Sequence, residues 1–78
     1  MEDKILDILE DICGDEIVRE DKDINLLDED LIDSLDYVEM LVKFETEFGI
    51  VMAPSEYTRE QMDTPNKIIE QVKAKIEG

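Results

Sequence analysis

The feature that most constrains the fold is the stretch from Asp33 to Gly49, where an irregular acidic segment changes into a helical pattern. Asp33 suits the N-cap position, and Asp36 stands three residues later, at the second position of a capping box. Gly49 is a typical helix stop signal. We expect the apolar stripe between them to comprise Leu35, Val38, Leu41, Val42 and Phe48, with Phe44 near its edge. The stretch therefore predicts a helix over residues 34–48.

Two further helices are predicted at the ends of the chain. The first covers residues 2–13 and stops at Gly14; its apolar side comprises Ile5, Ile8, Leu9 and Ile12, with Leu6 and Cys13 beside them. The last covers residues 65–76, with Thr64 as N-cap and Pro65 at the first helical position. Its apolar face comprises Ile68, Ile69, Val72 and Ile76.

The segments between these helices lose the helical period. Residues 15–33 predict a long ordered loop with one short helical turn, held to the helices by its apolar side chains. Residues 50–54 predict an extended connector. Ser55 and Glu56 predict the start of a short helix that reaches Gln61 and is anchored by Tyr57 and Met62. The fold class is therefore all-α: a small four-helix bundle with three main helices, one short helix and a long first loop.

The size and composition fit one folded domain that covers residues 1–78. With 78 residues of which 42% are apolar, the chain can bury one modest core. The formal net charge of −15, from 23 acidic and 8 basic residues, argues against nucleic acid or an anionic membrane as a partner. It favours basic protein partners that are attracted electrostatically.

Several classes of chemistry are excluded by residues that the sequence lacks. Histidine is absent, which removes Ser-His-Asp and Cys-His catalysis and His-based zinc sites. Cys13 is the only cysteine, so no internal disulfide can form, and we interpret it as a small core residue rather than a reactive thiol. With no signal peptide or membrane-spanning stretch recognisable, the sequence predicts a cytoplasmic protein without direct membrane insertion.

A calcium site is the next possibility. Asp21, Asp23 and Asn25 match the first three ligand positions of an EF-hand loop. The pattern then fails, because Leu26 stands where glycine is needed and Ile32 where a bidentate glutamate is needed. We therefore expect no EF-hand and no metal site, with weak, unspecific divalent binding by clustered carboxylates left open.

Ser34 stands where the acidic segment meets the predicted central helix. One interpretation is a serine favoured at a helix start. Another is a modification site, because a phosphate ester on a first-turn serine would face free N–H groups and the positive end of the helix dipole. Eight acids and a single base, Lys43, lie between residues 28 and 48. This segment favours the docking of a basic enzyme that modifies the serine.

Three groups of residues resemble the acyl carrier protein family, and the resemblance extends over essentially the whole chain. They are Asp33-Ser34-Leu35-Asp36, Val38-Glu39-Met40-Leu41 and Glu45-Thr46-Glu47-Phe48-Gly49-Ile50. The resemblance implies a four-helix bundle whose Ser34 hydroxyl receives 4′-phosphopantetheine covalently from coenzyme A. A phosphopantetheinyl transferase, using Mg²⁺ of its own reaction, would make this phosphoprotein. The implied partner-recognition surface comprises Asp33, Leu35, Asp36, Val38, Glu39 and Met40.

The C-terminal part is similar to the D-alanyl carrier branch of that family, in the segments Ala53-Pro54-Ser55-Glu56-Tyr57-Thr58-Arg59-Glu60 and Thr64-Pro65-Asn66-Lys67-Ile68-Ile69. Two positions depart from the branch: Leu35 stands where Met is usual and Asp30 where Gly is frequent. The resemblance implies a monomeric carrier, not an enzyme, that holds D-alanine as a thioester for teichoic acid D-alanylation in cell wall biogenesis. A ligase or synthase would load it, and an acyltransferase would unload it.

Two alternatives remain open at this point. One is a fatty-acid, polyketide or nonribosomal peptide carrier, because the loading enzyme chooses the cargo. The other is an acidic interaction module that carries no prosthetic group.

Overall fold

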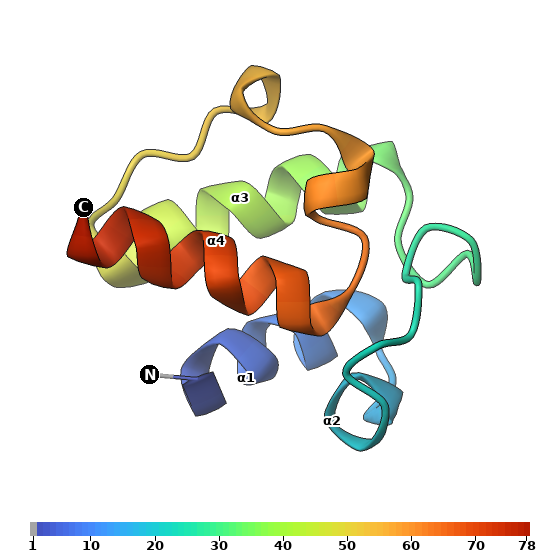
Figure 1. Cartoon of the computed structure of the whole chain (residues 1–78). Helices are drawn as coiled ribbons and strands as arrows, with labels where there is room; N and C mark the ends of the chain where they lie inside the picture. Colours follow the sequence, from blue (N-terminus) through green and yellow to red (C-terminus); the bar gives the residue numbers. More distant parts are fainter. Residues whose placement is uncertain (1) are drawn as a thin grey trace.

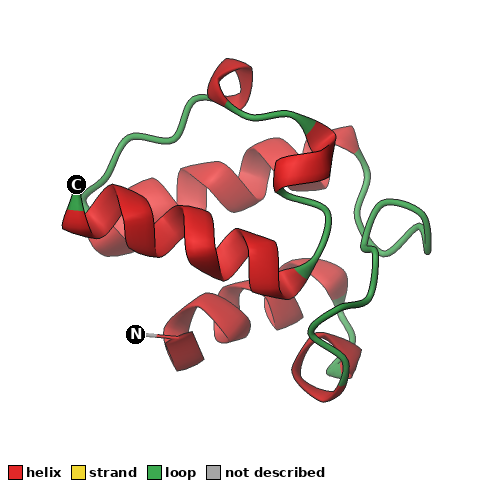
Figure 2. Cartoon of the chain, viewed as in Figure 1, coloured by secondary structure: helices red, strands yellow, loops and turns green. Residues whose placement is uncertain are grey.

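The computed structural model describes residues 2–78, apart from the side chain of Arg59, and the elements follow one another as helices joined by loops (Figure 1). The α-helices are α1 (Glu2–Cys13), α2 (Ile17–Glu20), α3 (Ser34–Phe48) and α4 (Pro65–Glu77). Two 3₁₀ turns, η1 (Pro54–Glu56) and η2 (Arg59–Gln61), lie between α3 and α4. Residues 2–78 contain no strand (Figure 2), so the predicted all-α class and the three main helices are confirmed.

The ends of α3 follow the local chemistry of the sequence. The Asp36 backbone N–H donates to the Asp33 carboxylate at 2.9 Å, and the Asp33 N–H donates back to the Asp36 carboxylate at 3.3 Å. This reciprocal capping box satisfies two backbone donors that a helix start leaves open. At the other end Gly49 takes a left-handed conformation with φ 65°, which glycine adopts without steric cost. The predicted boundaries of this helix are confirmed.

The core lies between α1, α3 and α4, and the first loop closes one end of it. Ile5 and Leu9 of α1, Phe44 of α3 and Ile68 and Val72 of α4 are fully buried. The loop adds Val18, Leu26 and Ile32, and the connector before α4 adds Met52 and Met62. The predicted apolar faces of the first and last helices, and the pinning of the loop by its apolar residues, are therefore confirmed.

The predicted apolar stripe of α3 is wrong in most of its members. The buried side chains are those of Met40, Leu41 and Phe44, with Tyr37 and Phe48 half-buried. Leu35, Val38 and Val42 are exposed by 80%, 44% and 52% of their surface. The helix carries apolar residues on two sides, and helical spacing alone does not decide which of them faces the core.

The short helix predicted for residues 55–61 is also wrong in detail. Pro54 rather than a Ser55 cap begins the first of two separate 3₁₀ turns, and extended backbone at Tyr57 interrupts the segment. The short fourth α-helix lies instead at Ile17–Glu20, in the first loop, where the sequence predicted a single helical turn.

Four hydrogen bonds fasten the first loop to the beginning of α4. The Leu26 N–H donates to the Asp63 carbonyl at 2.7 Å, and the Asn66 N–H donates to the Lys22 carbonyl at 3.0 Å. The Asn25 side-chain amide donates to the Asp63 carboxylate at 3.2 Å, and the Asn66 amide donates to Asp23 at 2.8 Å. These bonds fix the segment that leads into α3.

This arrangement separates the first turn of α3 from both ends of the described chain. In Figure 1, α1 begins and α4 ends at the left edge of the molecule. The first turn of α3 lies at the opposite edge, beside the loop that precedes it.

Candidate functional site

Ser34 is the first residue of α3, and its side chain is exposed. The cap belongs to Asp33, whose carboxylate accepts the Asp36 N–H, so the hydroxyl of Ser34 is not needed to start the helix. No histidine exists in the sequence to take its proton. The site therefore presents an accessible serine hydroxyl with no imidazole to activate it.

A cleft of about 390 Å³ opens directly beside Ser34. Its walls come from the first loop and from the first turns of α3: Leu27, Asp30, Ile32, Asp33, Tyr37 and Val38. The Tyr37 hydroxyl is buried without a hydrogen-bond partner among the described atoms, and burial, followed by the nearby Tyr57, raises its pKa. A buried hydroxyl without a partner is costly for the folded state.

No sequence pattern predicted this cleft. Its lining residues come from both the first loop and the start of α3, and only the folded loop brings Leu27 and Asp30 close to Tyr37 and Val38. Asp30 adopts φ 56° there, a left-handed conformation that is uncommon outside glycine and asparagine. A glycine at this position would adopt it without strain.

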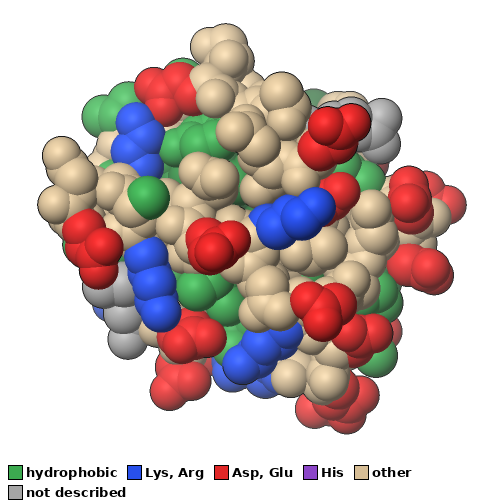
Figure 3. All heavy atoms as spheres, viewed as in Figure 1, with side chains coloured by type: hydrophobic (Ala, Val, Ile, Leu, Met, Phe, Trp, Pro, Cys, Tyr) green, Lys and Arg blue, Asp and Glu red, His purple; other side chains and the backbone are tan. Residues whose placement is uncertain are grey.

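The acids around Ser34 have no basic partners in the described structure. The eight ion pairs that the structure describes use carboxylates elsewhere in the fold and none of the six acids between residues 28 and 39. Figure 3 shows Lys and Arg side chains over the face of α4 and Asp and Glu side chains at the right-hand edge. The serine therefore lies in a one-sign surface that attracts cations.

The predicted recognition residues divide into accessible and buried ones. Asp33, Leu35, Val38 and Glu39 are exposed and Asp36 is half-exposed, so all five can contact another molecule. Met40 is 0% exposed, and its assignment to a contact surface is corrected, because its side chain is part of the core. Val42 was not among the predicted recognition residues, but it continues the exposed apolar row from Leu35 and Val38 at helical spacing.

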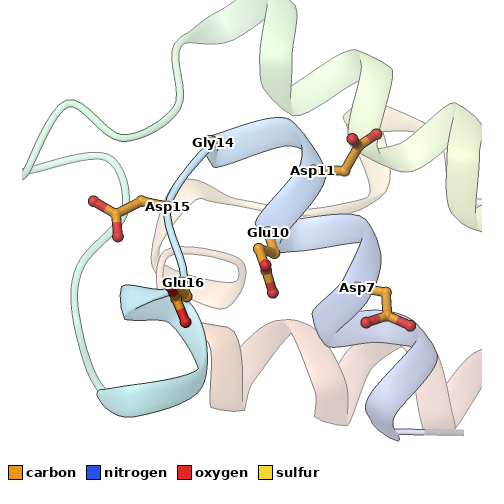
Figure 4. A pocket seen from close by; sticks show the side chains of 6 residues that line it. All are labelled: Asp7, Glu10, Asp11, Gly14, Asp15 and Glu16. Atoms are coloured by element: carbon orange, nitrogen blue, oxygen red, sulfur yellow. The ribbon is translucent and has the colours of Figure 1, made fainter.

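A larger open depression is lined by acids of α1 and of the short segment that connects it to α2 (Figure 4). Arg19 pairs with Asp7 and with Glu10 there, the latter at 2.6 Å. Nearby, Lys43 pairs with Asp11 at 2.6 Å and lowers the pKa of that carboxyl. Three of the carboxylates that line the depression, those of Asp7, Glu10 and Asp11, are therefore already paired with basic side chains of the same chain.

Residues 2–78 contain no group of three or more His, Cys, Asp or Glu side chains placed to hold a metal ion. The polar residues of the EF-hand-like segment accept hydrogen bonds within the protein. The Asp21 carboxylate accepts the Asp23 N–H, and the Asn25 side-chain oxygen accepts the N–H groups of Leu27 and Asp28. Asp23 accepts from Asn66. These residues shape the loop.

Cys13 is half-buried at the end of α1. Burial, and then the charges of Asp36 and Asp15, raise the pKa of its thiol to about 11. The thiol is therefore protonated at neutral pH, which agrees with the prediction of an unreactive cysteine.

A helical bundle that presents one exposed, unactivated serine at the start of a central helix, beside an open cleft, has the architecture of a carrier protein. Residues 3–72 match the family model described as "Phosphopantetheine attachment site". The chain therefore belongs to the phosphopantetheine-attachment family of carrier proteins, whose prosthetic group is covalent 4′-phosphopantetheine.

The curated relatives are similar over nearly their whole length. The chain is 53% identical to the D-alanyl carrier protein of Abiotrophia defectiva over 76 residues, which is 97% of this chain and 96% of the relative. It is 43% identical to that of Enterococcus faecalis, covering 95% of each chain. It is 39% identical to that of Bacillus subtilis, covering 88% of each.

No helix among residues 2–78 has the length and apolar character needed to cross a membrane.

Proposed function

We propose that Ser34 carries the 4′-phosphopantetheine group and that the cargo is D-alanine, held as a thioester for transfer toward teichoic acids. The exposed position of Ser34 at the first residue of α3 is the observation that carries the attachment site. The D-alanyl carrier relatives support the cargo. When bound, the prosthetic group supplies a thiol at the end of a flexible arm.

The attachment step follows from the surroundings of Ser34. Its hydroxyl oxygen bonds to the phosphorus of coenzyme A that bears the pantetheine, the bond from that phosphorus to the departing 3′,5′-ADP breaks, and the hydroxyl proton passes to a base of the transferase. The first-turn N–H groups of Ser34 and Leu35 donate no described hydrogen bond inside the protein. They are placed to hold the resulting phosphodiester.

The partners in this proposal are a phosphopantetheinyl transferase, a D-alanine-activating ligase and an acyltransferase. The unpaired carboxylates of residues 28–39 would attract the basic surfaces of these enzymes, and the exposed side chains of Leu35, Val38 and Val42 would add apolar contact. Such steered contacts favour fast exchange between successive partners. The proposal places residues 1–78 as one monomeric carrier domain in the cytoplasm.

Intact-mass measurement tests the attachment site. The chain is incubated with coenzyme A, Mg²⁺ and a broadly specific transferase, and we expect one phosphopantetheine adduct. Ser34→Ala should abolish it. Ser55→Ala is the matched control, because Ser55 is the other serine of the chain and is also exposed, and it should keep the adduct. An adduct on Ser34→Ala would overturn the assignment.

The cargo is tested separately on the modified chain. With ATP and a D-alanine-activating ligase, we expect a D-alanyl adduct that neutral hydroxylamine removes, because hydroxylamine cleaves thioesters. Loading by a fatty-acyl or malonyl transferase in preference to this ligase would favour the fatty-acid or polyketide alternative. Tight binding of a basic partner by a chain that never takes an adduct would support the interaction module instead.

A further inference from the structure

The amines of this chain are a hazard to a thioester that the chain itself carries. A neutral amine forms a bond to the thioester carbonyl carbon, the bond from that carbon to the arm's sulfur breaks with its electron pair, and the amine proton passes to the departing sulfur. The acyl group then stays on the carrier as an amide, which no longer transfers. Because the arm tethers the cargo to the same molecule, the effective concentration of nearby amines is high.

The lysine nearest to Ser34 along the chain is Lys43, since residues 23–42 contain none. Lys43 lies on α3, and the helical rise places it roughly 14 Å farther along the helix axis than Ser34. Its ammonium donates a hydrogen bond to the Asp11 carboxylate of α1 at 2.6 Å. The other five lysines also form ion pairs with carboxylates.

The carboxylates around Lys43 disfavour its reactive form. The hydrogen bond from Lys43 to Asp11 and the charges of Asp11 and Glu39 raise the pKa of the amine, although partial burial opposes them. The ion pair also directs the ammonium toward α1. Both effects lower the population of neutral amine that is available to attack.

The thiol of Cys13 is held in its unreactive form in a comparable way. It is half-buried at the end of α1, and burial and the charges of Asp36 and Asp15 keep it protonated. Asp36 belongs to the first turn of α3, so an acid close to the attachment site acts on this thiol. A protonated thiol does not exchange with a thioester.

We propose that Asp11 protects the activated cargo from transfer onto the carrier itself by pairing with the amine of Lys43. The inference rests on the proposed aminoacyl thioester at Ser34. It gives an acid of α1 a role that is separate from the docking of partner enzymes at α3. The protected group is an aminoacyl thioester, and the prevented product is an amide on Lys43.

The loaded chain provides the first test. A broadly specific transferase loads it in one step from D-alanyl coenzyme A, and the product is incubated alone at mildly alkaline pH. Hydroxylamine then removes the thioester but not an amide, and peptide mass mapping locates the amide. We expect Asp11→Asn to form the amide at Lys43 about two- to fivefold faster than the wild-type chain, as the loss of one exposed ion pair predicts.

Two further chains control this measurement. Asp11→Asn combined with Lys43→Arg should form no amide at position 43. Asp3→Asn removes the same charge from an exposed position of α1 that belongs to no described ion pair, and it should match the wild-type chain. Equal rates of amide formation in the wild-type chain and Asp11→Asn would overturn the inference.

A soluble probe separates the reactivity of the amine from the attachment of the arm. The D-alanyl thioester of N-acetylcysteamine is offered to the unmodified chains, and Asp11→Asn should again be acylated faster at Lys43. A difference with this probe but not in the loaded chain would show that the tethered cargo does not reach Lys43, and would overturn the protection. If the transferase gives no adduct on Ser34, the proposed function is overturned and the protection with it. If the chains load but neither assay separates Asp11→Asn from the wild-type chain, only the protection is overturned.

Discussion

At the scale of single residues, the start of α3 has different residues for capping the helix and for presenting an exposed hydroxyl. Asp33 and Asp36 satisfy each other's backbone N–H groups, and Ser34 takes no part in that exchange. A serine that capped the helix would have its hydroxyl oxygen turned toward the backbone. The division leaves the hydroxyl open to solvent.

Asp30 is expected to cost stability because of its left-handed backbone. Asp30→Gly should raise the free energy of unfolding by about 0.5–1 kcal/mol, since glycine adopts a positive φ without a steric penalty. Urea denaturation measures the change. Asp30→Asn is the control, because it removes the same charge but keeps a side chain. Equal gains in both variants would assign the effect to charge and contradict the backbone explanation.

The raised pKa of the Cys13 thiol predicts a loss of folding stability at alkaline pH. Its pKa is about 11 in the folded chain against an ordinary 9.0, so the folded state holds the thiol proton more tightly. The resulting stabilisation is present below pH 9 and disappears as the pH rises toward 11. We expect the wild-type chain to lose stability relative to Cys13→Ser across this interval in urea titrations. The comparison cancels the tyrosines, which titrate in the same range. Parallel pH profiles would argue against the shift.

At the scale of elements, the first loop depends on Asn25 for its shape. Its side-chain oxygen accepts the N–H groups of Leu27 and Asp28, and its amide donates to Asp63. Asp63 is buried. Its second carboxylate oxygen lies 3.0 Å from the Lys67 ammonium, so the two charges form an ion pair although this oxygen accepts no hydrogen bond. Asn25 therefore connects the turn inside the loop to the residue that precedes α4.

Replacing Asn25 should loosen this connection locally. We expect Asn25→Ala to cost about 2 kcal/mol, because two partly buried hydrogen bonds and one exposed hydrogen bond are lost together. Hydrogen exchange should accelerate most at the N–H groups of Leu26 and Leu31, which are bonded within this region. Asn66→Ala removes only an exposed bond to Asp23 and serves as control, with a loss below about 0.5 kcal/mol. Uniform acceleration across α1 and α4 would contradict a local role.

The sequence predicted where the helices begin but not which side of α3 is buried. The starts of α3 and α4 were predictable, because Asp33 and Thr64 cap them by local hydrogen bonds. The buried side of α3 was not, because it is decided by packing against α1 and not by spacing. The cleft was not predictable either, since it depends on how the loop returns across the first turns of α3.

At the scale of the whole molecule, the net charge of −15 acts against the compact state. Salt screens this repulsion over about 10 Å at 0.1 M. We expect the thermal midpoint to rise by several degrees as NaCl increases from about 0.01 to about 0.5 M, measured by circular dichroism. The opposing effect is the screening of the described ion pairs, most of which are exposed and contribute little each. A midpoint that falls with salt would show that the ion pairs outweigh the repulsion.

The placement of the chain ends has a practical consequence. Both α1 and α4 have their free ends at the edge of the molecule opposite the first turn of α3 (Figure 1). A sensor chip, fluorophore or fused protein joined through Gly78 would therefore leave the serine pointing outward into the medium. Immobilised in this way, the domain could be presented in turn to each enzyme that visits it, and the dwell time of every visit could be read on the same molecule.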